Sequence, residues 1–199
     1  MGIKILFLDI DGVLNNCYTK DSCGVYIGID DKYVQNLRKI VDSADNCKIV
    51  LSSTWRLGLT RDKKRLKGHW EYLSNKLAKQ GLKIFDVTPD FKGSRGREIH
   101  QWLEDHKDLN IENWIVLDDE YFYDFSTYGI REHLVETYYY SSKGALNDEK
   151  TEEAIKLLNG DRKERWVYQH EYDMLTTEEK MNGTYYYILD GVDGGIYET

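Results

Sequence analysis

The sequence is poor in the features that mark secreted and membrane-spanning proteins. Its 199 residues include 3 cysteines, which cannot all pair and do not stand in a C-x-x-C spacing, so neither a disulfide framework nor a zinc site is indicated. No apolar run reaches the roughly 18 residues of a membrane span, and the start MGIKILFLD lacks the cleavage pattern of a signal peptide. We therefore expect a cytoplasmic protein with reduced thiols.

Positive charge is also scarce. The chain has 27 lysines and arginines against 35 aspartates and glutamates, which gives a net charge of −8. The overall field repels phosphate, so any binding of nucleic acid must depend on a local basic patch. A hydrophobic fraction of 41%, with 13% aromatic residues, excludes a disordered chain and is enough for one domain with a sizeable core.

Short apolar runs alternate with segments of helical periodicity along most of the chain. This alternation predicts an α/β fold in which a mainly parallel sheet is flanked by helices. The expected strands are residues 3–8, 48–51, 83–87, 114–117 and 134–138. Four segments each carry one apolar helical stripe, around residues 33–41, 70–77, 99–103 and 154–158.

The pattern changes after about residue 160, where the chain becomes aromatic, acidic and mixed in period. We expect one domain over residues 1–160 and a C-terminal extension over residues 161–199. Within the extension, the segments TYYYIL and GIYE flank an Asp-Gly turn. This arrangement predicts a hairpin, packed on the domain.

Polar residues follow three of the expected strands at the point where each strand ends. They are Asp9, Asp11, Ser52, Ser53, Asp118 and Asp119. Because the carboxyl ends of parallel strands meet at one edge of the sheet, where open α/β sheets bind their ligands, we expect these side chains to lie together. Four carboxylates at one edge would repel one another unless a hard cation neutralised them, and oxygen ligands suit Mg²⁺.

Other interpretations of the acidic segments remain. An isolated Asp-x-Asp is typical of a solvated strand end, and it is the Asp-Asp pair of a later strand that favours a metal site. A calcium loop of the EF-hand type fits poorly, because Gly12 stands at the fourth place instead of the sixth and a strand precedes it. The later segment DGVDGGIYE is typical of a hairpin turn, and the five histidines form no spaced ligand set.

Four motifs in order resemble a known family. FLDIDGVLN resembles the first motif of the haloacid-dehalogenase-like (HAD) phosphatases, IVLSSTWR their second and WIVLDDE their fourth. Together with RGREIHQWL, they are similar to the HAD branch found with Swiss-army-knife RNA repair proteins. The resemblance covers roughly residues 3 to 158. It implies a Rossmann-like three-layer α/β/α fold with little or no cap domain.

The family mechanism, carried over to these positions, implies a role for each acid. Asp9 would be the nucleophile that forms an aspartyl-phosphate, and Asp11 would protonate the leaving oxygen and then accept a proton from water. Asp118 and Asp119 would hold Mg²⁺ together with Asp9 and the backbone carbonyl of Asp11. An aspartate at position 11 favours phosphatase chemistry over that of HAD dehalogenases and P-type ATPases, which lack it.

The transferring phosphate also needs hydrogen-bond donors. The second motif offers Ser52, with Ser53 as the alternative because a register error of one residue exchanges them. The third motif of the family is a Lys or Arg, and here both Arg95 and Arg97 are available. Arg95 is favoured because it precedes the helix whose apolar stripe faces the core, although a surface arginine at a helix start remains the alternative.

The spacing between motifs leaves no room for a large cap domain, which predicts an open site suited to the end of a large substrate. The segment RLGLTRDKKRLKGHW after the second motif is basic and is flanked by Trp55 and Trp70. With Arg56, Lys63 and Lys64, it could grip a nucleic-acid backbone and stack a base. The alternative is a solvated helix start beside core tryptophans.

The sequence therefore predicts a Mg²⁺-dependent phosphatase that acts on a phosphate monoester, with a nucleotide or a nucleic-acid end as the leading substrate. One alternative is a small-metabolite phosphatase in which the segment NNCYTKDSCGVYIGID closes over the substrate. Another is a non-catalytic module that binds phosphate or a partner and uses the Tyr-rich extension as an interface. The presence of both Asp9 and Asp11 favours an enzyme.

Overall fold

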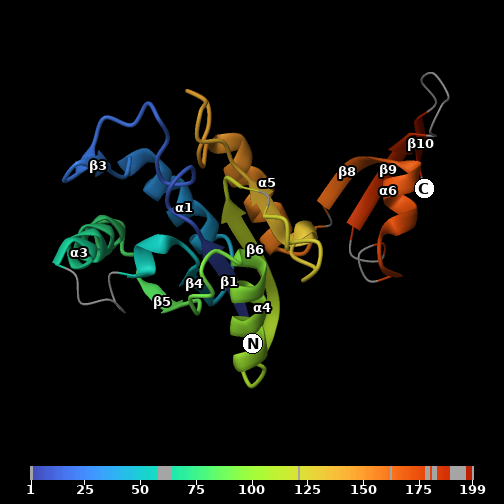
Figure 1. The fold of residues 1–199 in the computed structure, drawn as a ribbon, viewed down its shortest axis with the longest axis horizontal. Helices are drawn as coiled ribbons and strands as arrows, with labels where there is room; N and C mark the ends of the chain where they lie inside the picture. Colours follow the sequence, from blue (N-terminus) through green and yellow to red (C-terminus); the bar gives the residue numbers. More distant parts are fainter. Residues whose placement is uncertain are drawn as a thin grey trace.

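A computed structural model describes residues 2–57, 64–120, 122–161, 163–177, 180, 183–188 and 196–198. At its centre lies a five-stranded sheet with the strand order β5-β4-β1-β6-β7, in which all neighbouring strands are parallel (Figure 1). The strands are β1 (Ile3–Leu8), β4 (Cys47–Leu51), β5 (Ile84–Val87), β6 (Ile111–Asp118) and β7 (Leu134–Glu136). The predicted α/β class and the parallel sheet are confirmed.

Helices cover both faces of the sheet, as side-chain alternation along β1 shows. Leu6 and Leu8 belong to a core cluster that includes residues of α1 (Asp31–Asp42), α3 (Lys64–Ala78) and α5 (Asp148–Leu158). Ile5 and Phe7 face the other way and pack with Ile99 and Trp102 of α4 (Arg95–Asp105). Successive strand residues point to opposite faces, so β1 contributes to both cores of a three-layer α/β/α fold.

The strand boundaries differ slightly from those predicted. β6 begins at Ile111, three residues before the predicted start. The prediction began too late because the polar residues Glu112 and Asn113 interrupt the apolar run of this strand. The Asn113 amide donates hydrogen bonds to the carbonyl oxygens of Leu157 and Leu158, so this polar residue ties the strand to the end of α5. β7 is shorter than predicted and ends at Glu136.

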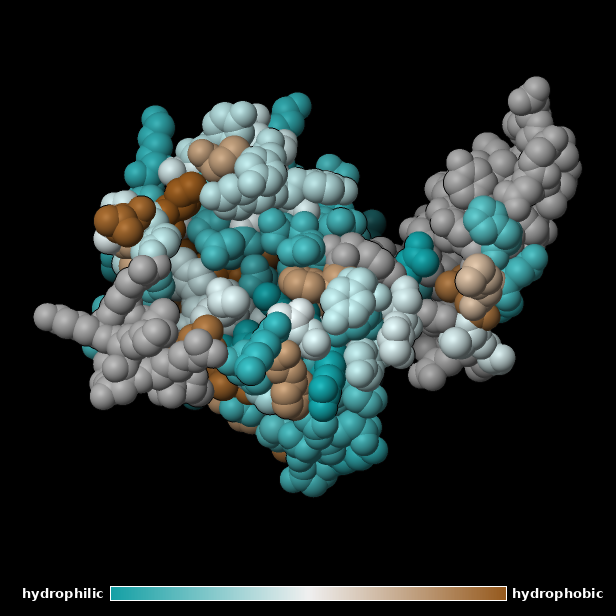
Figure 2. All heavy atoms as spheres, in the orientation of Figure 1, coloured by the Kyte–Doolittle hydropathy of each residue, from teal (hydrophilic) through white to brown (hydrophobic). Residues whose placement is uncertain are grey.

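Few elements interrupt the chain between the motifs. Among the described residues between β1 and β4, there are only a small hairpin of β2 (Ser22–Cys23) and β3 (Tyr26–Ile27) and helix α1. A 3₁₀ turn, η1 (Thr54–Arg56), and α3 follow β4, and a second, η2 (Arg131–His133), precedes β7. Figure 2 shows a largely hydrophilic surface in this view, with apolar residues gathered over the β2–β3 hairpin, where Val25 is 91% exposed.

The C-terminal segment forms a separate three-stranded sheet. Its elements are β8 (Lys163–Tyr168), α6 (Gln169–Met174), β9 (Gly183–Ile188) and β10 (Ile196–Glu198). β9 and β10 are antiparallel, as the predicted hairpin requires. β8, which the sequence did not predict, pairs in parallel with β9. The expected Asp-Gly turn lies outside the described residues. No helix in the described part of the chain is long and apolar enough to cross a membrane.

Candidate active site

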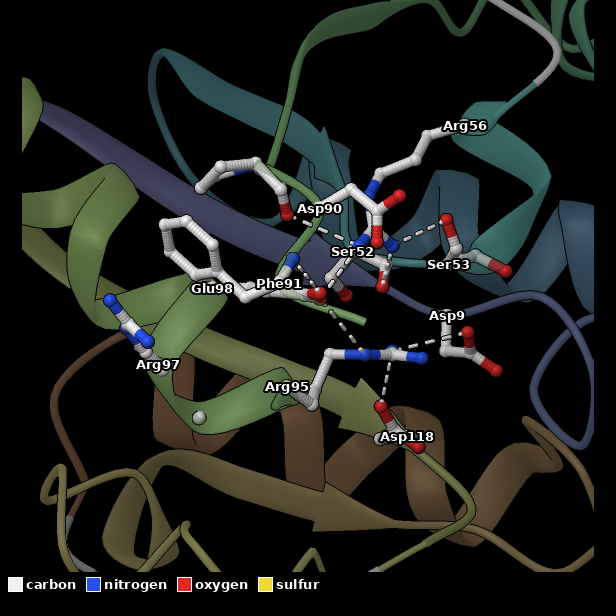
Figure 3. A network of polar contacts seen from close by, with 12 residues as sticks. Asp9, Ser52, Ser53, Arg56, Asp90, Phe91, Arg95, Arg97, Glu98 and Asp118 are labelled. Atoms are coloured by element: carbon white, nitrogen blue, oxygen red, sulfur yellow. Dashed lines mark hydrogen bonds and ion pairs between the residues drawn. The ribbon is translucent and has the colours of Figure 1, made fainter. Parts of the chain in front are cut away.

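The sheet continues its hydrogen bonding for one residue beyond three of its strands. The Asp9 amide donates to the Leu117 carbonyl at 2.9 Å, and the Ser52 amide donates to the Leu8 carbonyl at 2.9 Å. At the same edge, the Thr137 amide donates to the carbonyl of Asp118, the last residue of β6, at 2.9 Å. These bonds bring Asp9, Ser52 and Asp118 together at the carboxyl edge of the sheet (Figure 3).

Gly12 forms a tight turn directly after Asp11. Its φ is +76°, and a Cβ atom placed there would lie 2.1 Å from Cγ of Asp119. The Thr137 hydroxyl donates to the Gly12 carbonyl at 2.7 Å and fixes the turn from the side of β7. Only glycine therefore allows this backbone conformation together with the close approach of Asp119.

We expect Gly12→Ala to lower the unfolding temperature and to weaken any Mg²⁺ response, because the new methyl group must displace Asp119. Alanine at positive φ alone costs about 1 kcal/mol. Gly24→Ala is the matched control, since Gly24 also has positive φ (+66°) but has nothing within 4 Å of an added Cβ. Thermal unfolding of both variants with and without Mg²⁺ measures the difference. Equal effects of the two substitutions would contradict the steric account.

Three carboxylates at this edge could hold a metal ion. One oxygen from each of Asp9, Asp118 and Asp119 lies within 4.8 Å of the others. Burial raises the pKa of Asp9 and raises the pKa of Asp118 well above its ordinary value, although Arg95 beside them opposes both shifts. Burial, followed by the charge of Asp9, raises the pKa of Asp119 to about 6. An oxygen-only set with repelling charges, of which Asp9 and Asp118 are buried and Asp119 is half-buried, fits a hard divalent cation such as Mg²⁺.

The Asp11 side chain stands apart from this cluster. One of its oxygens accepts a hydrogen bond from the Asn15 amide at 2.9 Å, and the other accepts one from the indole N–H of Trp55 at 3.0 Å. The side chain is exposed. Two donors thus orient an accessible carboxyl group.

Arg95 bridges two of the buried acids. Its Nη1 atom lies 2.7 Å from Oδ2 of Asp118 and 3.2 Å from Oδ1 of Asp9. The carboxylate of Asp124 accepts hydrogen bonds from the amides of Gly96 and Arg97 and so fixes the first turn of α4. Of the two arginines that the sequence offered, it is therefore Arg95 that lies against the aspartates.

Arg97 lies on another side of the helix start. Its guanidinium carbon is 4.5 Å from the centroid of the Phe91 ring, and Figure 3 shows it directed away from Asp9. Arg97 is also exposed, whereas Arg95 is buried. The structure does not bring Arg97 to the aspartates.

The two serines after β4 have different environments. Ser52 is buried, and its Oγ has no hydrogen-bond partner among the described residues. The Ser53 Oγ accepts a hydrogen bond from the Trp55 amide at 3.4 Å at the start of η1. An unpartnered buried hydroxyl such as that of Ser52 is costly, whereas the Ser53 side chain forms a hydrogen bond with Asp9 that acts to lower the pKa of this acid.

Arg56 was expected to contact substrate, but the structure buries it against the backbone of Ser52 and Ser53. Its guanidinium forms a buried ion pair with Glu98 at 2.7 Å. Its Nη1 donates to the carbonyl oxygens of Ser52 and Ser53 at 2.9 and 2.8 Å. Arg56 therefore positions the backbone that carries the serines. Of the other predicted basic residues, Lys63 lies outside the described residues and Lys64 begins α3.

Sequence reasoning missed four of the residues that hold these groups in place, namely Glu98, Asp124, Thr137 and Asn15. It named Trp55 as a candidate for stacking a base, whereas the structure buries Trp55 and its indole N–H donates to Asp11. A signal existed for Glu98, because it stands four residues before Trp102 and so shares the buried face of α4. No such signal marks Asp124, because its contact joins the loop after β6 to the first turn of α4, about 27 residues earlier in the chain.

Comparison with known proteins gives the family of this chain. A family model described as the HAD domain in Swiss Army Knife RNA repair proteins matches residues 5–151. A search of curated proteins finds no match to the sequence. The matched region spans β1 to β7 and contains all of the acids, serines and arginines described above. The chain belongs to the family of HAD domains found in Swiss Army Knife RNA repair proteins.

Proposed function

We propose that this protein is a Mg²⁺-dependent phosphatase that hydrolyses the terminal phosphate monoester of a nucleotide or a nucleic-acid end. The observation that carries the proposal is the position of Asp9, which lies beside Asp118 and Asp119, within reach of Arg95, and at the same edge of the sheet as Ser52 and Ser53. A nucleophile, a charge-neutralising group and a phosphate ligand thus occupy one edge of the sheet.

In the first step, a carboxylate oxygen of Asp9 forms a bond to phosphorus while the bond from phosphorus to the leaving oxygen breaks. The leaving oxygen takes the electron pair of that bond and receives a proton from Asp11. In the second step, the Asp11 carboxylate takes a proton from water as the water oxygen attacks phosphorus. The aspartyl-phosphate then separates into free Asp9 carboxylate and inorganic phosphate.

The surrounding groups stabilise the charge of the transferring phosphate. The Ser52 hydroxyl donates to a phosphate oxygen, and Arg95 exchanges part of its contact with Asp9 for a second phosphate oxygen. Bound Mg²⁺, held by Asp9, Asp118, Asp119 and the Asp11 carbonyl, would shield the attacking carboxylate from the negative phosphate. Hydrogen bonds from Asn15 and Trp55 hold the Asp11 carboxyl group in the orientation that this proton transfer needs.

The test is hydrolysis of 3′-phosphorylated and 5′-phosphorylated oligonucleotides, compared with mononucleotides and a generic aryl phosphate, with Mg²⁺ and with EDTA. Turnover that requires Mg²⁺ supports the proposal, and no activity on any of these substrates would contradict it. Replacing Lys63, Lys64 and Arg65 with alanine tests the basic segment. If oligonucleotide turnover and its salt dependence stay unchanged, that segment does not bind the backbone.

A small-metabolite phosphatase is the second candidate, because the β2–β3 hairpin and α3 line an open pocket of about 420 Å³. The cavity is lined in part by Tyr26, His69 and Tyr72. It lies near Asp11, since the ring of Trp55, which donates to Asp11, is 5.1 Å from the ring of His69. Turnover of small phosphate esters in preference to every oligonucleotide would favour this candidate.

We expect Mg²⁺ to raise the unfolding temperature more at about pH 7.5 than at about pH 5. The pKa of Asp119 is raised to about 6 in the fold, so this acid stabilises the fold less as the pH rises from its ordinary pKa near 4 through 6. Mg²⁺ favours the carboxylate form and offsets that loss, whereas at about pH 5 it competes with the proton. Saturation at about 100 times Kd would add about 2.7 kcal/mol.

Thermal unfolding followed by circular dichroism, with NaCl of equal ionic strength as the control, measures this effect. An equal shift with NaCl, or a larger Mg²⁺ effect at about pH 5, would contradict the assignment of the acids as ligands.

A further inference from the structure

Exposed tyrosines lie in the loops that follow β1 and β7 at the carboxyl edge of the sheet. Tyr18 is 62% exposed, and Tyr138 and Tyr140 are 54% and 87% exposed. Tyr18 follows the motif that contains Asp9 and Asp11, and the other two follow β7 directly. We call these three residues the tyrosine rim. Large aromatic side chains that stay exposed together at a site mark a binding surface more often than scattered ones do.

Hydrogen bonds fix the two loops of the tyrosine rim to each other and to the catalytic turn. The Cys17 amide donates to the Tyr139 carbonyl at 3.2 Å, and the Asn16 side-chain amide donates to the Ser141 carbonyl at 3.1 Å. Thr137, next to Tyr138, bonds both Gly12 and Asp118. In Figure 1, the blue loop after β1 and the yellow-to-orange loop after β7 lie beside each other beyond the carboxyl ends of the strands.

The chemistry of the rim suits unpaired bases. Tyr139 and Tyr140 meet edge to face with ring centroids 5.0 Å apart, an arrangement that aromatic pairs prefer. Lys20 and Lys143, both exposed, lie in the same two loops and can meet phosphates. With a net charge of −8, the chain gains little from long-range attraction to a polyanion, so contact stacking must supply much of the affinity.

We infer that the tyrosine rim stacks the unpaired nucleotides adjacent to the phosphorylated end of a single-stranded nucleic acid. The inference rests on the proposed phosphatase function and names its substrate as a polynucleotide end. Stacking on tyrosine is tolerant of sequence, because every base has a π face. The rim therefore binds single strands of different sequence and disfavours duplexes, in which the bases are already stacked.

The experiment measures fluorescence anisotropy of a labelled single-stranded oligoribonucleotide of about ten nucleotides, a length within the usual span of such grooves. Probes with a 3′-phosphate and with a 5′-phosphate, and a duplex of each, are titrated with the whole protein. The variants are Tyr138→Ser with Tyr140→Ser, and the conservative pair Tyr138→Phe with Tyr140→Phe. Phe85→Ser is the matched control, because Phe85 is an exposed aromatic residue (46%) on β5, at the opposite edge of the sheet from β7.

The serine pair is expected to raise Kd for the single strand about ten-fold or more, while the phenylalanine pair and Phe85→Ser change it little. In steady-state assays of the oligonucleotide, KM rises in parallel with Kd. Single-strand binding that is unaffected by the serine pair, or no weaker for duplexes, would overturn the inference. Such a result would leave a protein-binding surface as the explanation of the exposed rings.

The binding readout needs no turnover, which separates the two proposals. Tyrosine-dependent binding by a protein that hydrolyses nothing would refute the proposed catalysis and keep the inference. Hydrolysis of oligonucleotides that does not depend on the tyrosine rim would support the proposed catalysis and refute the inference.

Discussion

Replacing Asp9 with asparagine is expected to lower kcat on any phosphate ester by a factor of at least about 10³, because the amide oxygen cannot form the acyl-phosphate. Asp9 is also a member of the acid cluster, so the same change weakens Mg²⁺ binding. The measurement is steady-state phosphate release at saturating Mg²⁺, with Asp45→Asn as an exposed control far from the cluster in sequence.

The fold itself should survive this substitution. Asp9 is buried with a raised pKa, and asparagine removes a charge that burial and the neighbouring acids disfavour. We therefore expect an unfolding temperature at about pH 7.5 that is close to or above that of the wild type. A large loss of stability would make the kinetic result uninformative, whereas a stable protein that keeps its full activity would refute Asp9 as the nucleophile.

Replacing Arg95 with methionine is expected to damage both stability and activity. Arg95 is the cation between the buried carboxylates of Asp9 and Asp118, and removing one partner of a buried ion pair typically costs about 3–5 kcal/mol. Activity should fall by about 10²–10³, because the transferring phosphate loses a charged donor. Urea unfolding and steady-state kinetics measure the two effects.

The loss of stability in Arg95→Met should be smaller at about pH 5 than at about pH 8. Both aspartates already have a raised pKa, and without the arginine they hold protons to still higher pH, which removes the uncompensated charge. Arg97→Met is the matched comparison, since Arg97 is exposed and lies over Phe91. A greater loss of activity in Arg97→Met than in Arg95→Met would reverse the assignment.

The sheet and the polar residues at its carboxyl edge could be predicted from the sequence because their signals are local. Each of the three central strands, β1, β4 and β6, has an apolar run directly before the polar residues at its carboxyl end, and the residue that ends a parallel strand is at the carboxyl edge wherever the strand sits in the sheet. The positions of Asp9, Ser52 and Asp118 follow from that rule alone.

The arrangement of the supporting residues could not be predicted in this way, because it depends on contacts between distant segments. Arg56 belongs by sequence to a basic, surface-like run, yet its burial is set by Glu98 on a different element. Ser52 and Ser53 have different surroundings because of a one-residue register. The hydrogen bond from the Ser52 amide to the Leu8 carbonyl fixes that register. Arg95 likewise differs from Arg97 because it pairs with Asp9 and Asp118, which come from two other segments of the chain.

The central claim is that Asp9 carries the phosphoryl group during turnover. Acyl-phosphates are reduced by borohydride, so the most direct test is to mix the protein with Mg²⁺ and an excess of a phosphorylated substrate, quench with borohydride and sequence the peptides by mass spectrometry. We predict homoserine at position 9, dependent on substrate and absent in Asp9→Asn. Phosphate release without modification of Asp9, or modification at another residue, would contradict the account.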